Sequence, residues 1–136
     1  MSVIKIIVAT HKNFIMPQDK ELYLPVHVGC EGKKDLGFQG DNTGDNISVL
    51  NPYYCELTGL YWAWKNLECD YLGLVHYRRY FTKKGVTYKD SINIDAVILD
   101  KDDIEKLLEV SNVIVPKKRK YYIETLYSHY AHTLDA

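Results

Sequence analysis

Side chains suited to binding a phosphorylated ligand follow an apolar segment in YLGLVHYRRYF, residues 71–81. If residues 76–81 stay extended, alternate side chains share a face. One face then carries His76, Arg78 and Tyr80, and the other carries Tyr77, Arg79 and Phe81. An arginine fork binds phosphate through paired charge-assisted hydrogen bonds. The pattern therefore predicts a phosphate-binding face with Arg78 favoured over Arg79, and pairing of one arginine with a structural carboxylate is the alternative.

A glycine-bearing segment, GDNTGDNIS at residues 40–48, is a second candidate because it places Asp41 and Asp45 four residues apart. Carboxylates in such a loop can orient a hydroxyl, act as a general base or bind a divalent cation through oxygen. Turn formation is the alternative, because Asp, Asn and Gly tolerate left-handed backbone and cap their own chain. The sequence does not separate these roles.

Further polar residues stand at predicted element ends. Thr10 and His11 follow the first apolar segment, where open α/β sheets bind ligands. Glu56 falls in the first turn of a predicted helix, so it either complements the helix dipole or serves as a general base. His129 and His132 share a helical face, and without a third ligand they favour hydrogen bonding over a metal site.

The elements that would position these residues alternate between strand and helix. Apolar, β-branched runs predict strands at 3–10, 71–76 and 112–116, and a less certain strand at 22–28 that Pro25 restricts to an edge or bulge. A helix is predicted over 51–66 with Asn51 as its N-cap, and another over 102–110. The order indicates βαβ units in a right-handed parallel sheet.

The predicted helix 51–66 has an apolar stripe. Its positions are Leu57, Leu60, Tyr61, Trp64 and Leu67. Trp64 is therefore expected in the core, and Trp62 is either a second packing surface or a stacking platform. Asp102 and Glu105 are spaced as a capping box for the helix that follows. That role explains Asp102 better than a metal-binding DxD motif with Asp100.

Length and composition limit the function further. A chain of 136 residues is long enough for one domain. Its 17 Lys and Arg against 18 Asp and Glu argue against nucleic-acid binding. The three cysteines fit reduced packing residues, and no apolar run reaches the ~20 residues of a membrane-spanning helix. We therefore expect a cytoplasmic protein with at most peripheral membrane association.

Several uncommon strings together resemble the domain of unknown function 4422, a glycosyltransferase-like family of bacterial capsular and exopolysaccharide gene clusters. They are IKIIVATHK, GDNIS, NPYYCELTGLYWAWKNL and YLGLVHYRRYF. The resemblance implies a nucleotide-sugar-dependent glycosyltransferase with a GT-A-like, Rossmann-like α/β fold, a mostly parallel sheet flanked by helices. Residues 1–136 would be a single domain, the N-terminal part of a longer family domain.

For a nucleotide-diphosphate sugar donor, we assign expected roles to the matching residues. Donor-binding residues are Thr10, His11, Arg78, Arg79 and Tyr80. Catalytic residues are Asp45, Glu56 and His76. Acceptor-binding residues, for a glycan or lipid-linked glycan, are Trp62 and His129. No metal ligands are assigned, although a divalent cation stays open. A truncated, inactive module that binds carbohydrate or a partner protein is the alternative, so whether this chain is itself an enzyme stays open.

Overall fold

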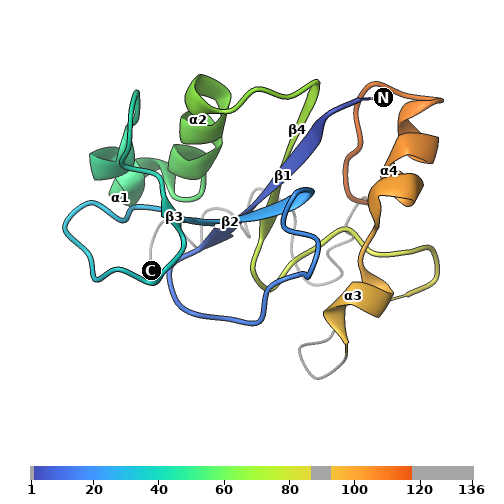
Figure 1. Cartoon of the computed structure of the whole chain (residues 1–136), viewed down its shortest axis with the longest axis horizontal. Coiled ribbons are helices and arrows are strands. Elements are labelled where there is room, and N and C mark those ends of the chain that lie inside the picture. The colour runs from blue at the N-terminus through green and yellow to red at the C-terminus, as the bar shows by residue number, and fades with distance from the viewer. Residues whose placement is uncertain (1, 87–92, 118–136) are drawn as a thin grey trace, which may run out of the picture.

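The computed structural model describes residues 2–86 and 93–117, and in these residues four strands form one parallel sheet (Figure 1). The strands are β1 (Ile4–Thr10), β2 (Tyr23–His27), β3 (Gln39–Gly40) and β4 (Tyr71–His76). Their order is β3-β2-β1-β4, so β1 is central and pairs with both β2 and β4. The predicted α/β class with a parallel sheet is confirmed.

Helices pack against both faces of this sheet, which buries the strands as continuous apolar runs. Alternation along β1 sends Ile4, Ile6 and Val8 into one cluster and Ile7 into the other. The first cluster includes α3 (Ile94–Val97) and α4 (Lys101–Leu108), and the second includes α2 (Leu57–Asn66). Figure 1 shows α2 and α4 on opposite sides of the strands. The sheet is therefore the middle layer of three.

The face that α2 turns toward the sheet differs from the predicted stripe. Its buried residues are Thr58, Gly59, Trp62 and Ala63. Leu57 is 49% exposed and Trp64 is 64% exposed, so the expectation that Trp64 lies in the core is wrong. The reason is close approach: a Cβ on Gly59 would lie 2.5 Å from Val28 Cγ1. Small residues carry this contact, and a count of large apolar residues does not detect them.

Replacement of Gly59 by alanine is expected to lower the free energy of unfolding by about 1–3 kcal/mol, because the added methyl overpacks a stiff β-branched neighbour. Urea denaturation measures the change. Lys65→Ala in the same helix is the control, and we expect it to change stability by less than about 0.5 kcal/mol because Lys65 is exposed. An equally small effect of Gly59→Ala would contradict the close packing of α2.

The helix predicted over 51–66 is interrupted. A 3-10 turn, η1 (Ser48–Leu50), leads into α1 (Asn51–Tyr54), and the chain breaks at Cys55 before α2 begins. Cys55 has φ 52°, which helical backbone does not allow. Asn51 is the first residue of α1 rather than its N-cap, and its side chain instead bonds to the break. Neither proline nor glycine marks this position in the sequence.

The other predicted elements have mixed outcomes. The prediction that Pro25 restricts this strand to an edge is wrong, because β2 lies between β1 and β3. Pro25 pairs with Val8 of β1, and its missing N–H is tolerated because β3 pairs only with the two residues after it. Residues 112–116 form no strand: Val113 is 69% exposed and Val115 is 71% exposed. No strand in the described ranges pairs with this segment, so the prediction of a buried strand is wrong.

The capping box of α4 is displaced by two residues from its predicted place. The Asp103 N–H donates to Asp100 Oδ1 at 2.9 Å, and the Asp100 N–H donates to Asp103 Oδ2 at 3.0 Å. The Lys83 ammonium lies 3.3 Å and 3.0 Å from the two carboxylates. Asp102 and Glu105 are therefore not the cap. Several pairs of acidic residues near the start of α4 have the spacing of a capping box, so the sequence permits more than one. Burial of Leu99 places Asp100 at the start of the helix.

Candidate functional site

Two adjoining hollows lie at the carboxyl ends of β1 and β4. One, of about 170 Å³, is lined by Ala9, Thr10, His11, Val28, Asn51, Cys55, Glu56 and His76. The other, of about 530 Å³, is lined by Glu56, Leu74, Val75, His76, Arg79, Tyr80, Phe81, Pro116 and Lys117. Because β2 and β4 flank β1 on opposite sides, this is where the strand order reverses, the place where open α/β sheets bind ligands. We call the two hollows together the switch-point cleft.

The end of β1 contributes Thr10 and His11 to the cleft. Thr10 is fully buried, and its hydroxyl donates to the Lys12 carbonyl and accepts the Lys12 N–H at 3.3 Å. The hydroxyl is therefore engaged in its own turn. The exposed His11 ring has its centroid 6.5 Å from that of His76 and packs edge-on to Tyr77 at 5.4 Å. The structure thus brings His11 and His76 together across the ends of two strands.

The segment after β4 turns instead of staying extended. The Arg79 N–H donates to the His76 carbonyl at 2.8 Å, and the His76 N–H donates to the Arg79 carbonyl at 3.2 Å. The predicted alternation of faces over 76–81 is therefore wrong. The turn buries Tyr77 to 1% exposure, with Phe14 edge-on at 5.1 Å, and this packing competes with extension.

This turn separates the two arginines. Both arginines are exposed, but of the two only Arg79 lines the switch-point cleft. The Arg78 guanidinium lies 5.4 Å from the centroid of the Tyr77 ring. The alternation that would put Arg78 on the same face as His76 is absent, so it no longer favours Arg78 over Arg79. Tyr80 also lines the cleft and packs edge-on to Tyr23 at 5.9 Å.

His76 sits in an electrostatic environment that favours its neutral form. Burial lowers the pKa of His76, and the charges of Arg78, His11 and Arg79 lower it further, while Glu56 opposes them. The backbone N–H of Arg78 donates to His76 Nδ1 at 3.4 Å. This contact favours the tautomer with the proton on Nε2. Near neutral pH the ring can therefore donate a hydrogen bond from Nε2 to a ligand oxygen.

Glu56 stands between the two hollows and lines both of them. It occupies the N-cap position of α2 but makes no capping hydrogen bond through its side chain. A carboxylate there also interacts favourably with the helix dipole. The break at Cys55 thus places a carboxylate in the same cleft as the His76 imidazole, a combination that suits proton transfer.

The sequence predicted no site role for Lys117, which lines the same hollow as Arg79. The basic run beginning at Lys117 was visible in the sequence. Its relation to Arg79 was not, because it depends on the path of residues 112–116. Together, Lys117 and Arg79 give the cleft two cations.

Two further predicted site residues, Asp45 and Trp62, do not line the cleft. Asp45 lies on the exposed side of α2, where it accepts the Tyr61 hydroxyl at 2.9 Å. Trp62 is 4% exposed and donates from Nε1 to Thr43 Oγ1 at 2.8 Å, so its role as a stacking platform for an acceptor is wrong. His129 falls outside the described residues. Burial of the Trp62 ring follows from the face that α2 presents to the sheet.

In the acidic loop of residues 40–48, Asp41 has a structural role. This side chain is fully buried, and it accepts hydrogen bonds from the Gly29 and Cys30 N–H groups and the Ser48 and Thr58 hydroxyls. Four donors saturate the carboxylate. Within residues 2–86 and 93–117, no group of three or more His, Cys, Asp or Glu side chains is arranged to hold a metal.

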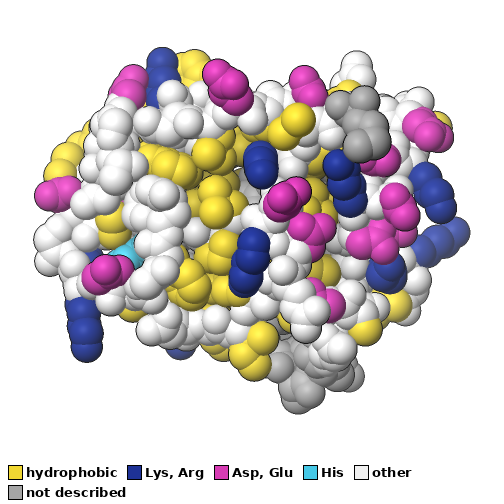
Figure 2. All heavy atoms as spheres, in the orientation of Figure 1, with side chains coloured by type: hydrophobic (Ala, Val, Ile, Leu, Met, Phe, Trp, Pro, Cys, Tyr) yellow, Lys and Arg dark blue, Asp and Glu magenta, His cyan; other side chains and the backbone are white. Residues whose placement is uncertain are grey.

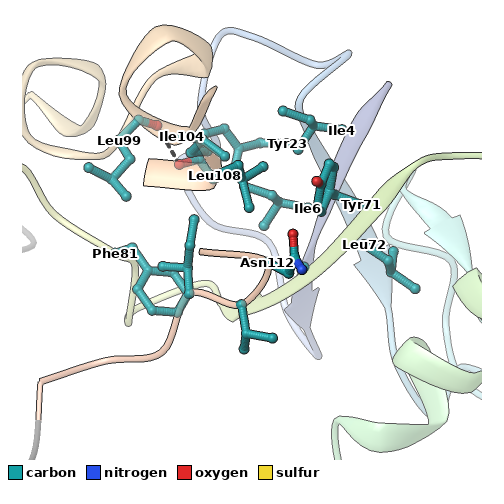
Figure 3. Close-up of a pocket in the computed structure, with 13 residues that line it drawn as sticks. Ile4, Ile6, Tyr23, Tyr71, Leu72, Phe81, Leu99, Ile104, Leu108 and Asn112 are labelled. Atoms are coloured by element: carbon teal, nitrogen blue, oxygen red, sulfur yellow. Dashed lines mark hydrogen bonds between the residues drawn. The ribbon is translucent and has the colours of Figure 1, made fainter. Parts of the chain in front are cut away.

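An apolar cavity of about 230 Å³ lies on the α4 side of the sheet, away from these groups. Figure 3 shows side chains of β1, β2 and α4 converging on it, with the Tyr23 hydroxyl bonded to the Leu99 carbonyl. Its lining carries few polar groups, so we regard it as incomplete core packing.

Over the face in Figure 2, positive and negative side chains intermingle.

The parallel sheet with helices on both faces defines an α/β fold. The chain belongs to the family described as Domain of unknown function (DUF4422), whose model matches residues 5–136, as the resemblance predicted. It is also similar to a solved structure described as the apo structure of the WbbM bifunctional glycosyltransferase. The identity is 42% and the TM-score 0.55, over 63% of this chain and 16% of that one. A search of curated proteins found no match.

No helix in the described part of the chain is long and apolar enough to cross a membrane.

Proposed function

We propose that this chain contributes the donor site of a glycosyltransferase that uses a nucleotide-diphosphate sugar. The acceptor would be a glycan or lipid-linked glycan, and the setting would be capsular or exopolysaccharide assembly at the cytoplasmic side. The observation that carries the proposal is one cleft that combines two cations, Arg79 and Lys117, with the Glu56 carboxylate and the His76 imidazole. The 42% identity to part of a bifunctional glycosyltransferase supports the same reaction class.

In this proposal, each group acts at a different point of the reaction. Arg79 and Lys117 bind the diphosphate and stabilise the charge that develops as the bond between the anomeric carbon and the phosphate oxygen breaks. Glu56 accepts the proton of the acceptor hydroxyl while the oxygen of that hydroxyl bonds to the anomeric carbon. His76 donates from Nε2 to a ligand oxygen.

Three further residues that line the cleft have positioning roles. Thr10 and His11 border the nucleotide, and Tyr80 forms the wall beside Arg79. The two cations supply positive charge of the kind that a divalent cation supplies at other phosphate sites. Donor binding is therefore expected both with and without Mg²⁺.

Calorimetric titration with uridine diphosphate and its sugar conjugates tests the donor site. Arg79→Ala is expected to weaken binding by about 10- to 30-fold, because a charge-assisted bond to phosphate contributes about 1.5–2 kcal/mol. Arg78→Ala is the matched control, and its effect should stay below about threefold because Arg78 lies outside the cleft. Equal losses in the two variants would contradict the assignment of Arg79. Absence of binding to any nucleoside diphosphate would contradict the proposed function.

A further inference from the structure

The backbone is strained where the chain delivers Glu56 to the cleft. Cys55 adopts φ 52° and ψ −131°, and no other non-glycine residue in the described parts of the chain has a positive φ. Such a conformation costs about 1–3 kcal/mol and persists only where surrounding contacts determine it. Cys55 and Glu56 both line the cleft. The contacts that hold this break therefore bear on the position of Glu56.

One of these contacts is made by the Asn51 side chain. Its Nδ2 group donates to the Cys55 carbonyl at 2.8 Å and to Thr58 Oγ1 at 3.1 Å. The Cys55 N–H also donates to the Asn51 carbonyl at 2.8 Å. Asn51 therefore bonds to both peptide groups of Cys55 and ties the end of α1 to the first turn of α2.

The Thr58 hydroxyl continues this chain of hydrogen bonds into the interior. It accepts from Asn51 and donates to Asp41 Oδ2 at 2.6 Å. Asp41 is itself anchored by the Gly29 N–H at 2.7 Å and the Ser48 hydroxyl at 2.6 Å. Because Asp41 and Thr58 are fully buried, solvent does not compete for these bonds.

The end of β2 supports Asn51 directly. Gly29 has φ +63°, and a Cβ there would lie 2.4 Å from Asn51 Cγ. The Asn51 side chain therefore rests on the bare backbone of Gly29. The chain of contacts runs from the end of β2, through Asp41, Thr58 and Asn51, to the break at Cys55.

We propose that the buried Asp41–Thr58–Asn51 hydrogen-bond chain is a positioning device that holds the break at Cys55 and so places the Glu56 carboxylate beside His76. Groups that support a reactive side chain in this way determine its geometry without touching the ligand. A role in catalysis for this position of Glu56 rests on the proposed function. The positioning itself can be measured in the free chain.

The test uses His76 as a reporter of the Glu56 carboxylate. The charged groups that act on His76 are Glu56, Arg78, Arg79 and His11, and Lys117 lines the same hollow. Nuclear magnetic resonance titration of the His76 ring gives its pKa in each variant. Since Glu56 raises the pKa of His76, Glu56→Gln is expected to lower that pKa. Thr58→Val, which removes only the bridging hydroxyl, is expected to lower it too.

Three further variants make the result specific. Thr58→Ser restores the hydroxyl and should return the wild-type pKa of His76. In the Glu56→Gln background, Thr58→Val should cause no further fall, because both changes act through the same carboxylate. Asn51→Ala leaves every hydrogen bond of Asp41 intact and should also lower the pKa. It provides the test if Thr58→Val does not fold.

An unchanged His76 pKa in a folded Thr58→Val or Asn51→Ala variant, with Glu56→Gln lowering it, would overturn the proposal. No change in Glu56→Gln would overturn it as well, since Glu56 would then not lie beside His76. Failure of nucleoside diphosphate binding would count only against the proposed function, because the titration contains no ligand.

Discussion

Replacement of Asp41 by asparagine is expected to lower the free energy of unfolding at pH 7 by about 3 kcal/mol. The carboxylate is fully buried and accepts from two backbone N–H groups and the hydroxyls of Ser48 and Thr58. An amide replaces one accepting oxygen by a donor, so donors on that side lose their partner. Urea denaturation of both proteins measures the difference.

This effect is expected to depend on pH in a defined direction. Burial alone would raise the pKa of Asp41, but the hydrogen bonds from Ser48, Thr58, Gly29 and Cys30 outweigh it and lower the pKa. A carboxyl group with a lowered pKa in the folded state stabilises the protein above its unfolded pKa, near 3.9, and loses that contribution as the pH falls through the folded value. The difference in the free energy of unfolding between wild type and Asp41→Asn should therefore become smaller below about pH 4.

Asp45→Asn is the matched control for this experiment. Asp45 is exposed, and an asparagine there keeps an oxygen that can accept the Tyr61 hydroxyl. We expect the change in stability to stay below about 0.5 kcal/mol. A similar loss in both variants would mean that the acidic loop acts through its overall charge and not through the buried hydrogen bonds of Asp41.

Strands β1 and β4 could be predicted from the sequence because their physical signal is local. The run at 3–10 and the run at 71–76 are apolar on successive residues, which suits strands covered on both faces. The position of the cleft followed from the same reasoning, since polar residues after β1 and β4 must meet at the carboxyl edge of a parallel sheet. Thr10, His11 and His76 do lie there.

The orientation of α2 could not be predicted in the same way. Its sequence contains a convincing stripe of large apolar residues, which the structure leaves largely exposed or half-buried. The helix instead packs through Thr58, Gly59, Trp62 and Ala63, and the small residues among them allow its backbone to approach the sheet. Backbone distance between two elements is a tertiary property, so a single-helix pattern does not contain it.

The choice between the two arginines failed for a related reason. Alternation assumes that the chain stays extended, and nothing within residues 76–81 signals a turn through proline or glycine. The turn forms because burial of Tyr77 against Phe14 competes with extension. The sequence does not place Lys117 in the cleft with Arg79, because the two residues come from segments far apart in the chain.

Replacement of Glu56 by glutamine is expected to reduce turnover of a nucleotide-diphosphate sugar by about 100-fold, the lower range for loss of a general base. Glutamine keeps the size of the side chain but cannot accept the proton. Release of the nucleoside diphosphate, with water or a glycan as acceptor, measures turnover. Donor affinity should change by less than about threefold, because Arg79 and Lys117 still bind the diphosphate.

Glu68→Gln is the control for this last experiment, since it removes an exposed carboxylate two residues beyond the end of α2. It should leave turnover and affinity unchanged. If Glu56→Gln turned over at the wild-type rate, the proton acceptor would have to be another group, and the strained break at Cys55 would serve packing alone. Saturable donor binding without turnover in the wild-type chain would instead favour a binding module. The two measurements separate these cases because affinity reports the cations of the cleft and turnover reports its carboxylate.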